Sequence, residues 1–276
     1  MKPVHIKGDI DLLSKNSLSI LITQDGLSYS IYDIDNNKVQ ALVSKQFSAN
    51  ANRCEEIKQF LSDENVLQFE NVNVVYATKS ITIVPDAIFE ESQAENIFAL
   101  NRRIADDEKI LFSKLPKSQT VLIYSAKKEI INLLDSTFTR YSICPQSHSF
   151  IESGLTRTKI SEKPNSPRMF VQVFEDFFDV LVIDKAQICN YNTYGYKSSN
   201  DILYFIVNAF EQLGLSQEEC EVVFSGFIES DDLAVIHLKK FVRTVYFESI
   251  NRDYKYFYRF QEFAPHYFYN FINAGK

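Results

Sequence analysis

The stretch from Met169 to Ile228 decides the fold of this chain, and it begins with the alternating apolar run Phe170-Val171-Gln172-Val173-Phe174. An acidic turn, Glu175-Asp176, separates this run from a second apolar run, Phe177 to Ile183. A third extended segment covers Gln187 to Tyr194. Short apolar or alternating runs broken by polar turns are typical of β-strands, so this part predicts a three-stranded meander.

A helix and a further strand follow the meander. The apolar residues of the helix recur at a spacing that places them on one stripe: Ile202, Phe205, Ile206, Ala209, Phe210 and Leu213. Gly214 provides the C-terminal stop of this helix, because glycine readily adopts the left-handed conformation there. The segment from Cys220 to Gly226 then reads as a strand that ends at a glycine. The stretch therefore predicts three strands, a helix and a strand.

An earlier part of the chain predicts the same order. Its segments are, in sequence, the strand Ser17–Thr23, the turn Gln24-Asp25-Gly26, the strands Leu27–Ile34 and Lys38–Phe47, a helix with the stripe Cys54, Ile57, Phe60 and Leu61, and the buried strand Val72–Ala77. The Asp-Gly pair is typical of a hairpin turn with positive φ. When Asp25 is aligned with Asp176, Ile20 matches Val171 and Ile22 matches Val173. This repeated order predicts an internal duplication.

The two predicted units are separated by material that only the first unit contains. Alternating strand and helix patterns indicate an inserted α/β subdomain at about residues 80–145, with a helix expected over Asp86–Leu100. The segment 159–167 contains two prolines and mixed charges, so it predicts a linker. We therefore expect a first domain over residues 1–158, in which 1–16 is a loosely attached lead-in, and a second domain over 168–276.

Composition narrows the class of protein. The chain has 276 residues, 45% of them hydrophobic, and a net charge of −7, which argues against an extended nucleic-acid surface. The four cysteines are far apart and the four histidines have no metal-ligand spacing, so we expect reduced thiols, no metal site and a cytoplasmic location. The N-terminus has no apolar signal region, and no run is long enough for a transmembrane helix.

The repeated layout resembles the actin-like, or ribonuclease-H-like, ATPase superfamily. The sequence also looks like a bacterial family of unknown function that is assigned this fold. Within the superfamily it is most similar to cytoplasmic actin-like proteins of pilus assembly and type II secretion. There the run Val121-Leu122-Ile123-Tyr124 and the strand Tyr141–Cys144 resemble the inserted subdomain of the first half. The resemblance implies a duplicated α/β fold with two domains around a cleft.

The superfamily binds nucleotide through three loops, and all three differ here. The first phosphate loop keeps glycine in Gln24-Asp25-Gly26 but has glutamine in place of the metal-side aspartate. The second reads Glu175-Asp176-Phe177-Phe178, with aromatic rings where a close approach to phosphate requires glycine. The adenosine loop, Ser225-Gly226-Phe227, keeps one of two glycines. The resemblance therefore implies no catalytic residues and no cofactor. The alternative is an ATP-binding protein, or a weak Mg-dependent ATPase that uses the interdomain cleft through Asp25, Gly26, Glu175, Asp176 and Gly226.

The C-terminal tail is unusually aromatic. It contains Tyr254, Tyr256, Phe257, Tyr258, Phe260, Phe263, Tyr267, Phe268, Tyr269 and Phe271. One interpretation is a terminal strand and helix, Glu262 to Ala274, that packs on the second domain. The other is a partner-binding surface built on Tyr256, Tyr258, Tyr267 and Tyr269. The cations Arg252, Lys255 and Arg259 lie among the rings, but too few to favour nucleic acid. We therefore expect a non-catalytic binding or scaffold component that contacts another protein or itself.

Overall fold

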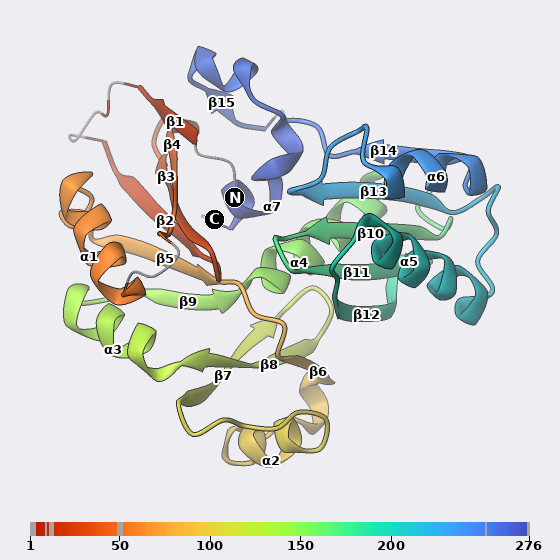
Figure 1. The fold of residues 1–276 in the computed structure, drawn as a ribbon, viewed down its shortest axis with the longest axis horizontal. Helices are drawn as coiled ribbons and strands as arrows, with labels where there is room; N and C mark the ends of the chain where they lie inside the picture. The colour runs from red at the N-terminus through yellow and green to blue at the C-terminus, as the bar shows by residue number, and fades with distance from the viewer. Residues whose placement is uncertain (1–3, 9, 11–13, 49–51, 252, 275–276) are drawn as a thin grey trace.

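A computed structural model of the chain shows two large β-sheets, a smaller third sheet and helices that cover them (Figure 1). The structure describes residues 4–8, 10, 14–48, 52–251 and 253–274. Arg252, one of the tail cations, lies outside the described residues. In the part of the chain that is described, no helix is long and apolar enough to cross a membrane.

The first sheet has the strand order β1-β4-β3-β2-β5-β9, and β15 also pairs with β4. Its strands are β1 (Val4–Lys7), β2 (Asn16–Ile22), β3 (Gly26–Asp33), β4 (Lys38–Gln46), β5 (Asn71–Tyr76), β9 (Ser142–Pro145) and β15 (Lys255–Tyr256). The antiparallel meander β2-β3-β4 and the parallel strand β5 confirm the predicted order. Residues 4–7 were expected to be loosely attached, but they pair with residues 41–44 because Val4 and Ile6 bury their side chains.

The second sheet repeats this arrangement with the order β12-β11-β10-β13-β14. Its strands are β10 (Arg168–Val173), β11 (Phe177–Asp184), β12 (Gln187–Gly195), β13 (Glu221–Gly226) and β14 (Thr244–Phe247). β10 pairs antiparallel with β11 and parallel with β13, as β2 pairs with β3 and β5. The two sheets therefore share the strand frame that the sequence predicts.

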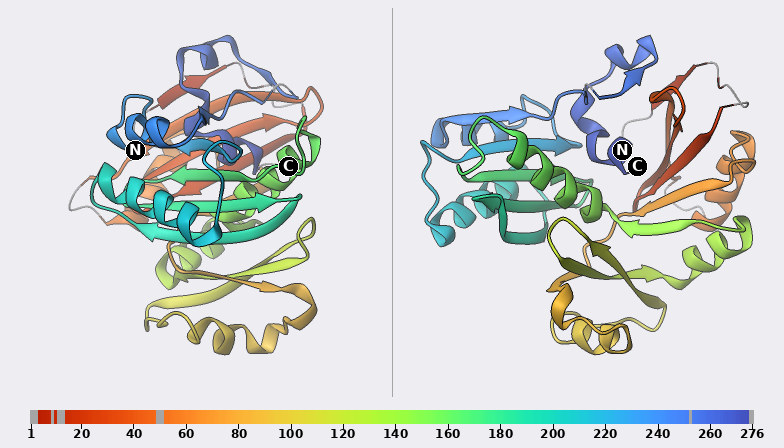
Figure 2. Two further views of the ribbon diagram at one scale, coloured as in Figure 1. Left: turned by 90° about the vertical axis from the view of Figure 1, so that its right-hand side faces the viewer. Right: turned by 180° about the vertical axis from the view of Figure 1, so that it is seen from behind.

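The inserted subdomain is a three-stranded sheet at one end of the molecule (Figures 1 and 2). Its strands are β6 (Ile81–Pro85), β7 (Glu108–Leu115) and β8 (Thr120–Lys127). The helix expected over 86–100 is wrong in extent. Two 3₁₀ turns, η1 (Asp86–Ile88) and η2 (Glu91–Gln93), precede a short helix, α2 (Ala94–Ala99), because Ala94 and Phe98 supply the buried residues of that helix.

Each large sheet has one face covered by helices of its own half. α1 (Arg53–Asp63) and α3 (Lys128–Thr137) cover the first sheet, and the side chain of Asn52 caps α1. α5 (Ser199–Leu213) and α6 (Leu233–Phe241) cover the second. The predicted stripe of α5 is confirmed at Ile202, Ile206, Ala209 and Phe210, which are all buried.

The opposite faces are covered by elements that cross between the halves. α4 (Gln146–Ile160) extends into the first two residues of the segment predicted as a linker, and it packs on β10 and β11 of the second sheet through Phe150, Ile151 and Leu155. The C-terminal tail packs on Leu21, Val39, Leu42 and Val75 of the first sheet. Figures 1 and 2 show the tail between the two large sheets.

The interpretation that the tail packs as a strand and helix on the second domain is therefore incomplete. The tail consists of β15, the 3₁₀ turns η3 (Tyr258–Glu262) and η4 (Pro265–Tyr267), and the short helix α7 (Tyr269–Asn273). β15 pairs with β4, whereas η4 and α7 also contact β13. The apolar face of the first sheet needs a cover, and the aromatic rings of the tail provide it.

Candidate functional site

The tips of the first hairpins of the two halves have the same backbone hydrogen bonds. The turn Gln24-Asp25 joins β2 to β3, and the turn Glu175-Asp176 joins β10 to β11. Three backbone N–H···O bonds of the first tip each have a counterpart at the second. Thr23 N donates to Gly26 O (2.9 Å), as Phe174 N donates to Phe177 O (2.8 Å). Phe47 N donates to Asp25 O (2.8 Å), as Tyr196 N does to Asp176 O (3.2 Å), and Ala77 N donates to Ile22 O (2.8 Å), as Phe227 N does to Val173 O (2.7 Å). Position 26 therefore corresponds to position 177.

The side chains at the two tips differ. In the second half the rings of Phe174 and Phe177 stack with centroids 4.7 Å apart, and Phe227 meets Phe174 edge-on at 6.2 Å. Phe174 and Phe177 are both buried, and the hydroxyl of Tyr196 donates to the carbonyl of Phe174 at 2.6 Å. Rings and their contacts therefore fill the inner side of this turn.

The two glycines of the predicted nucleotide loops have different backbone roles. Gly26 is the first residue of β3 and does not adopt the positive φ expected of it, because Gln24 and Asp25 form the turn between Thr23 and Gly26. Gly226 has a φ of +81°, and a Cβ there would lie 2.8 Å from Val173 N and closer still to the carbonyl oxygen of Val173. Local chain geometry therefore requires Gly226, whether or not a ligand binds.

A cavity of about 250 Å³ lies beside the first tip. It is bounded by the end of β5, the start of α1, the inserted subdomain and one residue of the second half, Phe177. The lining residues are Ile22, Thr23, Gln24, Phe47, Arg53, Ile57, Tyr76, Ala77, Thr78, Lys79, Ser80, Glu108, Ser125, Lys127, Glu129, Ile130 and Phe177. We call this the hairpin cavity. It is the candidate functional site, because polar groups and three cations converge on it.

Two of these cations already have acidic partners. Lys79 forms an ion pair with Asp176 and so joins the first half to the tip of the second hairpin. Lys127 lies 2.8 Å from Asp107 and 3.5 Å from Glu108, and this pairing raises the pKa of Lys127. Burial raises the pKa of Tyr76, whose hydroxyl accepts a hydrogen bond from Lys127 N at 3.3 Å. The hairpin cavity therefore presents paired charges rather than a concentrated positive field.

The structure does not gather the five proposed nucleotide residues around the hairpin cavity. Gly226 lines a second cavity of only about 10 Å³, together with Phe174 and Phe227. Asp25 accepts a hydrogen bond from the Thr23 hydroxyl at 2.8 Å, and Asp176 pairs with Lys79. Glu175 occupies the other turn position of the second hairpin. Among the described residues, no group of three or more His, Cys, Asp or Glu side chains could hold a metal ion.

A buried polar network, which the sequence did not suggest, joins the two halves near this site. Asp179 of β11 is fully buried and accepts hydrogen bonds from Thr193 (2.6 Å), Tyr191 (3.0 Å) and Gln146 (3.1 Å). Gln146, at the start of α4, also bonds Thr78 N and O at 3.0 and 2.9 Å. Burial raises the pKa of Asp179 to about 6, against the smaller effect of these bonds. The sequence feature that could have indicated this network is Asp179 itself, a carboxylate inside the apolar run Phe177–Ile183.

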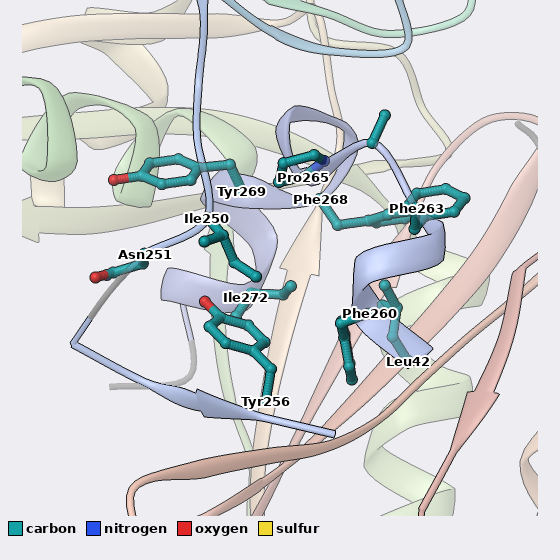
Figure 3. Close-up of a pocket in the computed structure, with 11 residues that line it drawn as sticks. Leu42, Ile250, Asn251, Tyr256, Phe260, Phe263, Pro265, Phe268, Tyr269 and Ile272 are labelled. Atoms are coloured by element: carbon teal, nitrogen blue, oxygen red, sulfur yellow. The ribbon is translucent and has the colours of Figure 1, made fainter. Parts of the chain in front are cut away.

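The four tail tyrosines proposed to bind a partner are placed differently from one another. Tyr258 is 69% exposed, whereas Tyr267 and Tyr269 are buried. Tyr267 donates to Glu229, and the ring of Tyr269 lies 5.5 Å from the Arg157 guanidinium of α4. Tyr256 and Tyr269 line a small apolar hollow of about 20 Å³ in the tail, shown in Figure 3. The structure does not bring the four side chains together on one exposed surface.

Comparison with solved structures identifies the class of protein. A protein from Bacteroides thetaiotaomicron VPI-5482, described as having an actin-like ATPase fold and unknown function, is 26% identical and superposes with a TM-score of 0.81 over 89% of this chain and 97% of its own. PilM, in the PilM–PilN type IV pilus biogenesis complex, is 10% identical with a TM-score of 0.63 over 94% and 97%. The chain therefore has the actin-like ATPase fold, which confirms the predicted fold class.

A family model makes the assignment more specific. The model of the family described as "Protein of unknown function (DUF3822)" matches residues 7–245, so the chain belongs to that family. Among the curated proteins, none matches the sequence. The resemblance to a bacterial family of unknown function with this fold is thereby confirmed, as is the similarity in layout to an actin-like pilus-assembly protein.

Proposed function

We propose that this protein is a non-catalytic binding or scaffold component built on an actin-like frame. The observation that carries the proposal is the stack of Phe174 on Phe177 at the second hairpin tip. A phosphate at such a tip is held by backbone N–H groups, and only a residue without a side chain lets the phosphate reach them. Here two buried rings take that volume.

Two further features support the loss of nucleotide chemistry. Asp176, which the alternative assigns to a metal, is paired with Lys79. Gly226, which the alternative assigns to adenosine contact, lines a cavity far smaller than a nucleotide requires. The frame that remains is rigid and can present binding surfaces, because one fold can carry functions unrelated to its original nucleotide site.

Titration calorimetry with ATP and MgCl₂ tests the proposal. We expect no saturable heat at ATP concentrations up to about 1 mM, which corresponds to a binding free energy weaker than roughly −4 kcal/mol. The matched variants are Phe177→Gly, which removes one ring of the stack, and Tyr258→Ser in the exposed part of the tail. Micromolar binding by the unaltered protein, with measurable phosphate release, would overturn the proposal.

The second candidate is an ATP-binding protein or a weak Mg-dependent ATPase. Gly26 at the first tip and Arg53 in the hairpin cavity beside it favour this alternative. Under this alternative, binding of ATP should weaken in Arg53→Gln, because the guanidinium would contact phosphate. The same calorimetric titration therefore separates the two functions.

We also infer an internal duplication, supported by the matched strand orders and the three matched hydrogen bonds of the hairpin tips. For the binding role we propose a protein partner in the cytoplasm. PilM, which has this fold, is part of a complex with PilN, and that supports the idea that an actin-like frame can serve assembly. Light scattering of the purified protein tests the self-association form of the proposal.

A further inference from the structure

The charged side chains of the hairpin cavity fall into two groups. Lys79 and Lys127 are held in ion pairs with acids in or beside the cavity. Arg53 and Glu129 also line the cavity, but neither side chain forms an ion pair or a hydrogen bond with another residue that the structure describes. The cavity therefore has one cation and one anion without partners, and these two are not paired with each other.

Helix stability does not explain the position of Arg53. It is the first residue of α1, where the helix dipole disfavours a cation. The side chain of Asn52 already accepts hydrogen bonds from the N–H groups of Cys54 and Glu55, so the helix cap needs nothing from the guanidinium. A planar guanidinium at the wall of a cavity is suited to a carboxylate, which it can bind through two parallel hydrogen bonds.

Two hydroxyls of the cavity wall can join Arg53 in holding such a group. Burial raises the pKa of Tyr76, and the smaller opposing effects include the charge of Arg53, so the two side chains lie close together. The Tyr76 hydroxyl accepts a hydrogen bond from Lys127 N at 3.3 Å, which leaves its own proton available. Ser125 is only 2% exposed, and its hydroxyl bonds no other described residue. Buried hydroxyls normally have partners, so a group inside the cavity is needed to complete this one.

Glu129 supplies the opposite charge on another wall of the cavity. It lies in the first turn of α3, where the helix dipole stabilises a carboxylate. α1 and α3 are in contact, and each contributes one buried isoleucine to the lining, Ile57 and Ile130. The apolar wall of the cavity therefore belongs to the same two helices that carry the unpaired charges.

Size and charge balance limit the occupant. The volume of about 250 Å³ is below the usual range of sites for drug-sized ligands. The three cations of the lining are matched by four acids in the lining or paired to it: Glu108, Glu129, Asp107 and Asp176. No excess positive charge remains for a phosphate chain. A small ligand with one charge of each sign and no net charge fits both limits.

We propose that the hairpin cavity binds a free amino acid with an apolar side chain. The carboxylate of the amino acid accepts hydrogen bonds from Arg53 and Tyr76, and its ammonium group donates to Glu129. Its side chain packs on Ile57 and Ile130. The inference rests on the proposed function, since it requires a cavity free of nucleotide, and it gives the binding component a small ligand.

Isothermal titration of the full-length protein with L-leucine, L-methionine and L-phenylalanine tests the proposal. For the tightest binder, the amide removes the negative charge and the deaminated acid removes the positive charge; for leucine these are L-leucinamide and 4-methylpentanoate. The site variants are Arg53→Gln and Glu129→Gln. The matched variants are Lys58→Gln and Glu55→Gln, which are both exposed on α1 outside the cavity lining.

The proposal predicts saturable binding of at least one of the three amino acids with a Kd below about 1 mM. It also predicts at least tenfold weaker binding of the amide and of the deaminated acid. Binding of the amino acid should weaken at least tenfold in Arg53→Gln and in Glu129→Gln, and change less than twofold in Lys58→Gln and Glu55→Gln. Melting temperatures close to that of the unaltered protein show that the variants are folded.

Three results would overturn the proposal. The first is no binding of any of the three amino acids at about 5 mM. The second is equal binding of the amino acid and its deaminated acid, and the third is a loss confined to Arg53→Gln; either would assign the cavity to a simple anion. ATP is titrated separately, so micromolar ATP binding overturns the proposed function, whereas failure of the amino acids without ATP binding overturns only this inference.

Discussion

The two hairpin tips have the same backbone and different chemistry. At the first, Gly26 begins β3 beside a cavity of about 250 Å³, whereas at the second Phe177 stacks on Phe174 and the space is filled. The matched hydrogen bonds show that strand pairing, and not the identity of residue 26 or 177, builds the turn. The difference teaches that the same frame keeps its shape whether one turn position borders a cavity, as at Gly26, or packs in the core, as at Phe177.

The two halves also differ in the segments that cover their sheets, because each half of the chain supplies a cover for the sheet of the other half. α4, from the first half of the chain, covers β10 and β11, and the aromatic tail, from the second half, covers the first sheet. Each sheet thus depends on a segment from the other half for one apolar face. The two halves should therefore unfold together rather than separately.

Removal of the tail should have the largest effect. Truncation of residues 254–276 removes the buried rings of Tyr254, Phe260, Phe268 and Phe271 from the first sheet. At roughly 1.5–3 kcal/mol for each burial, the loss rivals the whole stability of a domain. We expect a truncated chain without a cooperative thermal transition, measured by circular dichroism.

The control for the truncation is Tyr258→Ser, since that ring is mostly exposed. Its melting temperature should stay within about 2 °C of the unaltered protein, as for most surface substitutions. A truncated chain that melts cooperatively near the same temperature would show that the tail is an appendage. It would also restore the interpretation of the tail as an interface.

The next largest effect should come from Gly226→Ala, a change at one of the proposed nucleotide residues. Alanine adds a Cβ against the backbone of Val173 at a φ that side chains rarely adopt. The strain and the overlap together should cost roughly 4 kcal/mol in the free energy of unfolding, measured by urea titration. In Gly195→Ala the nearest atom would be 3.8 Å away, so that control should change stability by less than about 0.5 kcal/mol. Equal losses in both variants would contradict the argument.

Much of the order of strands and turns could be predicted, because each of these elements has a recognisable pattern in its local sequence. The alternation around Glu175-Asp176 and its alignment with Gln24-Asp25 gave the turns that the matched bonds confirm. The cover of the first sheet could not be predicted, since residues such as Phe268 and Leu42, which share one core cluster, are far apart in the chain. The helix over 86–100 failed for a related reason, because the two buried residues of this stretch, Ala94 and Phe98, both lie in α2.

Much less of the site could be predicted. Sequence comparison marked positions 25, 26, 175, 176 and 226, but the structure gives Gly226 a backbone role and Asp176 an ion-pair role. The hairpin cavity is bounded by residues from seven separate stretches of the chain, from Ile22 to Phe177, and no local pattern predicts their convergence. Asp179 stood inside an apolar run, and a buried carboxylate requires donors that only the folded chain assembles.

Asp179 should give the third effect, a pH dependence that its counterpart in β3, Ser28, cannot give, because a serine hydroxyl does not titrate. Its pKa is raised from 3.8 to about 6 in the folded chain, so folding favours the protonated acid. The unaltered protein should therefore gain stability relative to Asp179→Asn as the pH falls from 7.5 through 6 toward 4. The full difference is roughly 3 kcal/mol.

Urea midpoints of both proteins at several pH values measure this difference. Asp201→Asn is the matched control, because that carboxyl lies on the surface at the start of α5 and its pKa is lowered by the Lys197 and Ser198 backbone N–H groups. The unaltered protein should lose stability relative to Asp201→Asn in acid, rather than gain it, because a lowered pKa means that folding favours the charged carboxylate. A flat difference between the unaltered protein and Asp179→Asn from pH 7.5 to 5 would show that the network does not hold a buried charge.

The smallest effect should come from the ion pair that links the two halves, Lys79 with Asp176. Both side chains are more than a third exposed, so solvent and salt screen their attraction. Lys79→Met should therefore lower the free energy of unfolding by less than about 1 kcal/mol, and 1 M NaCl should remove most of that difference. Met keeps the apolar stem, so the change tests the charge rather than the packing.

The counterpart of Lys79 in the second half is Glu229, which accepts a hydrogen bond from Tyr267 of the tail. Because that contact is partly buried with the tail, Glu229→Gln should cost more than Lys79→Met and respond less to salt. The reverse order would mean that the tip of the second hairpin, and not the tail, is the stronger link between the halves.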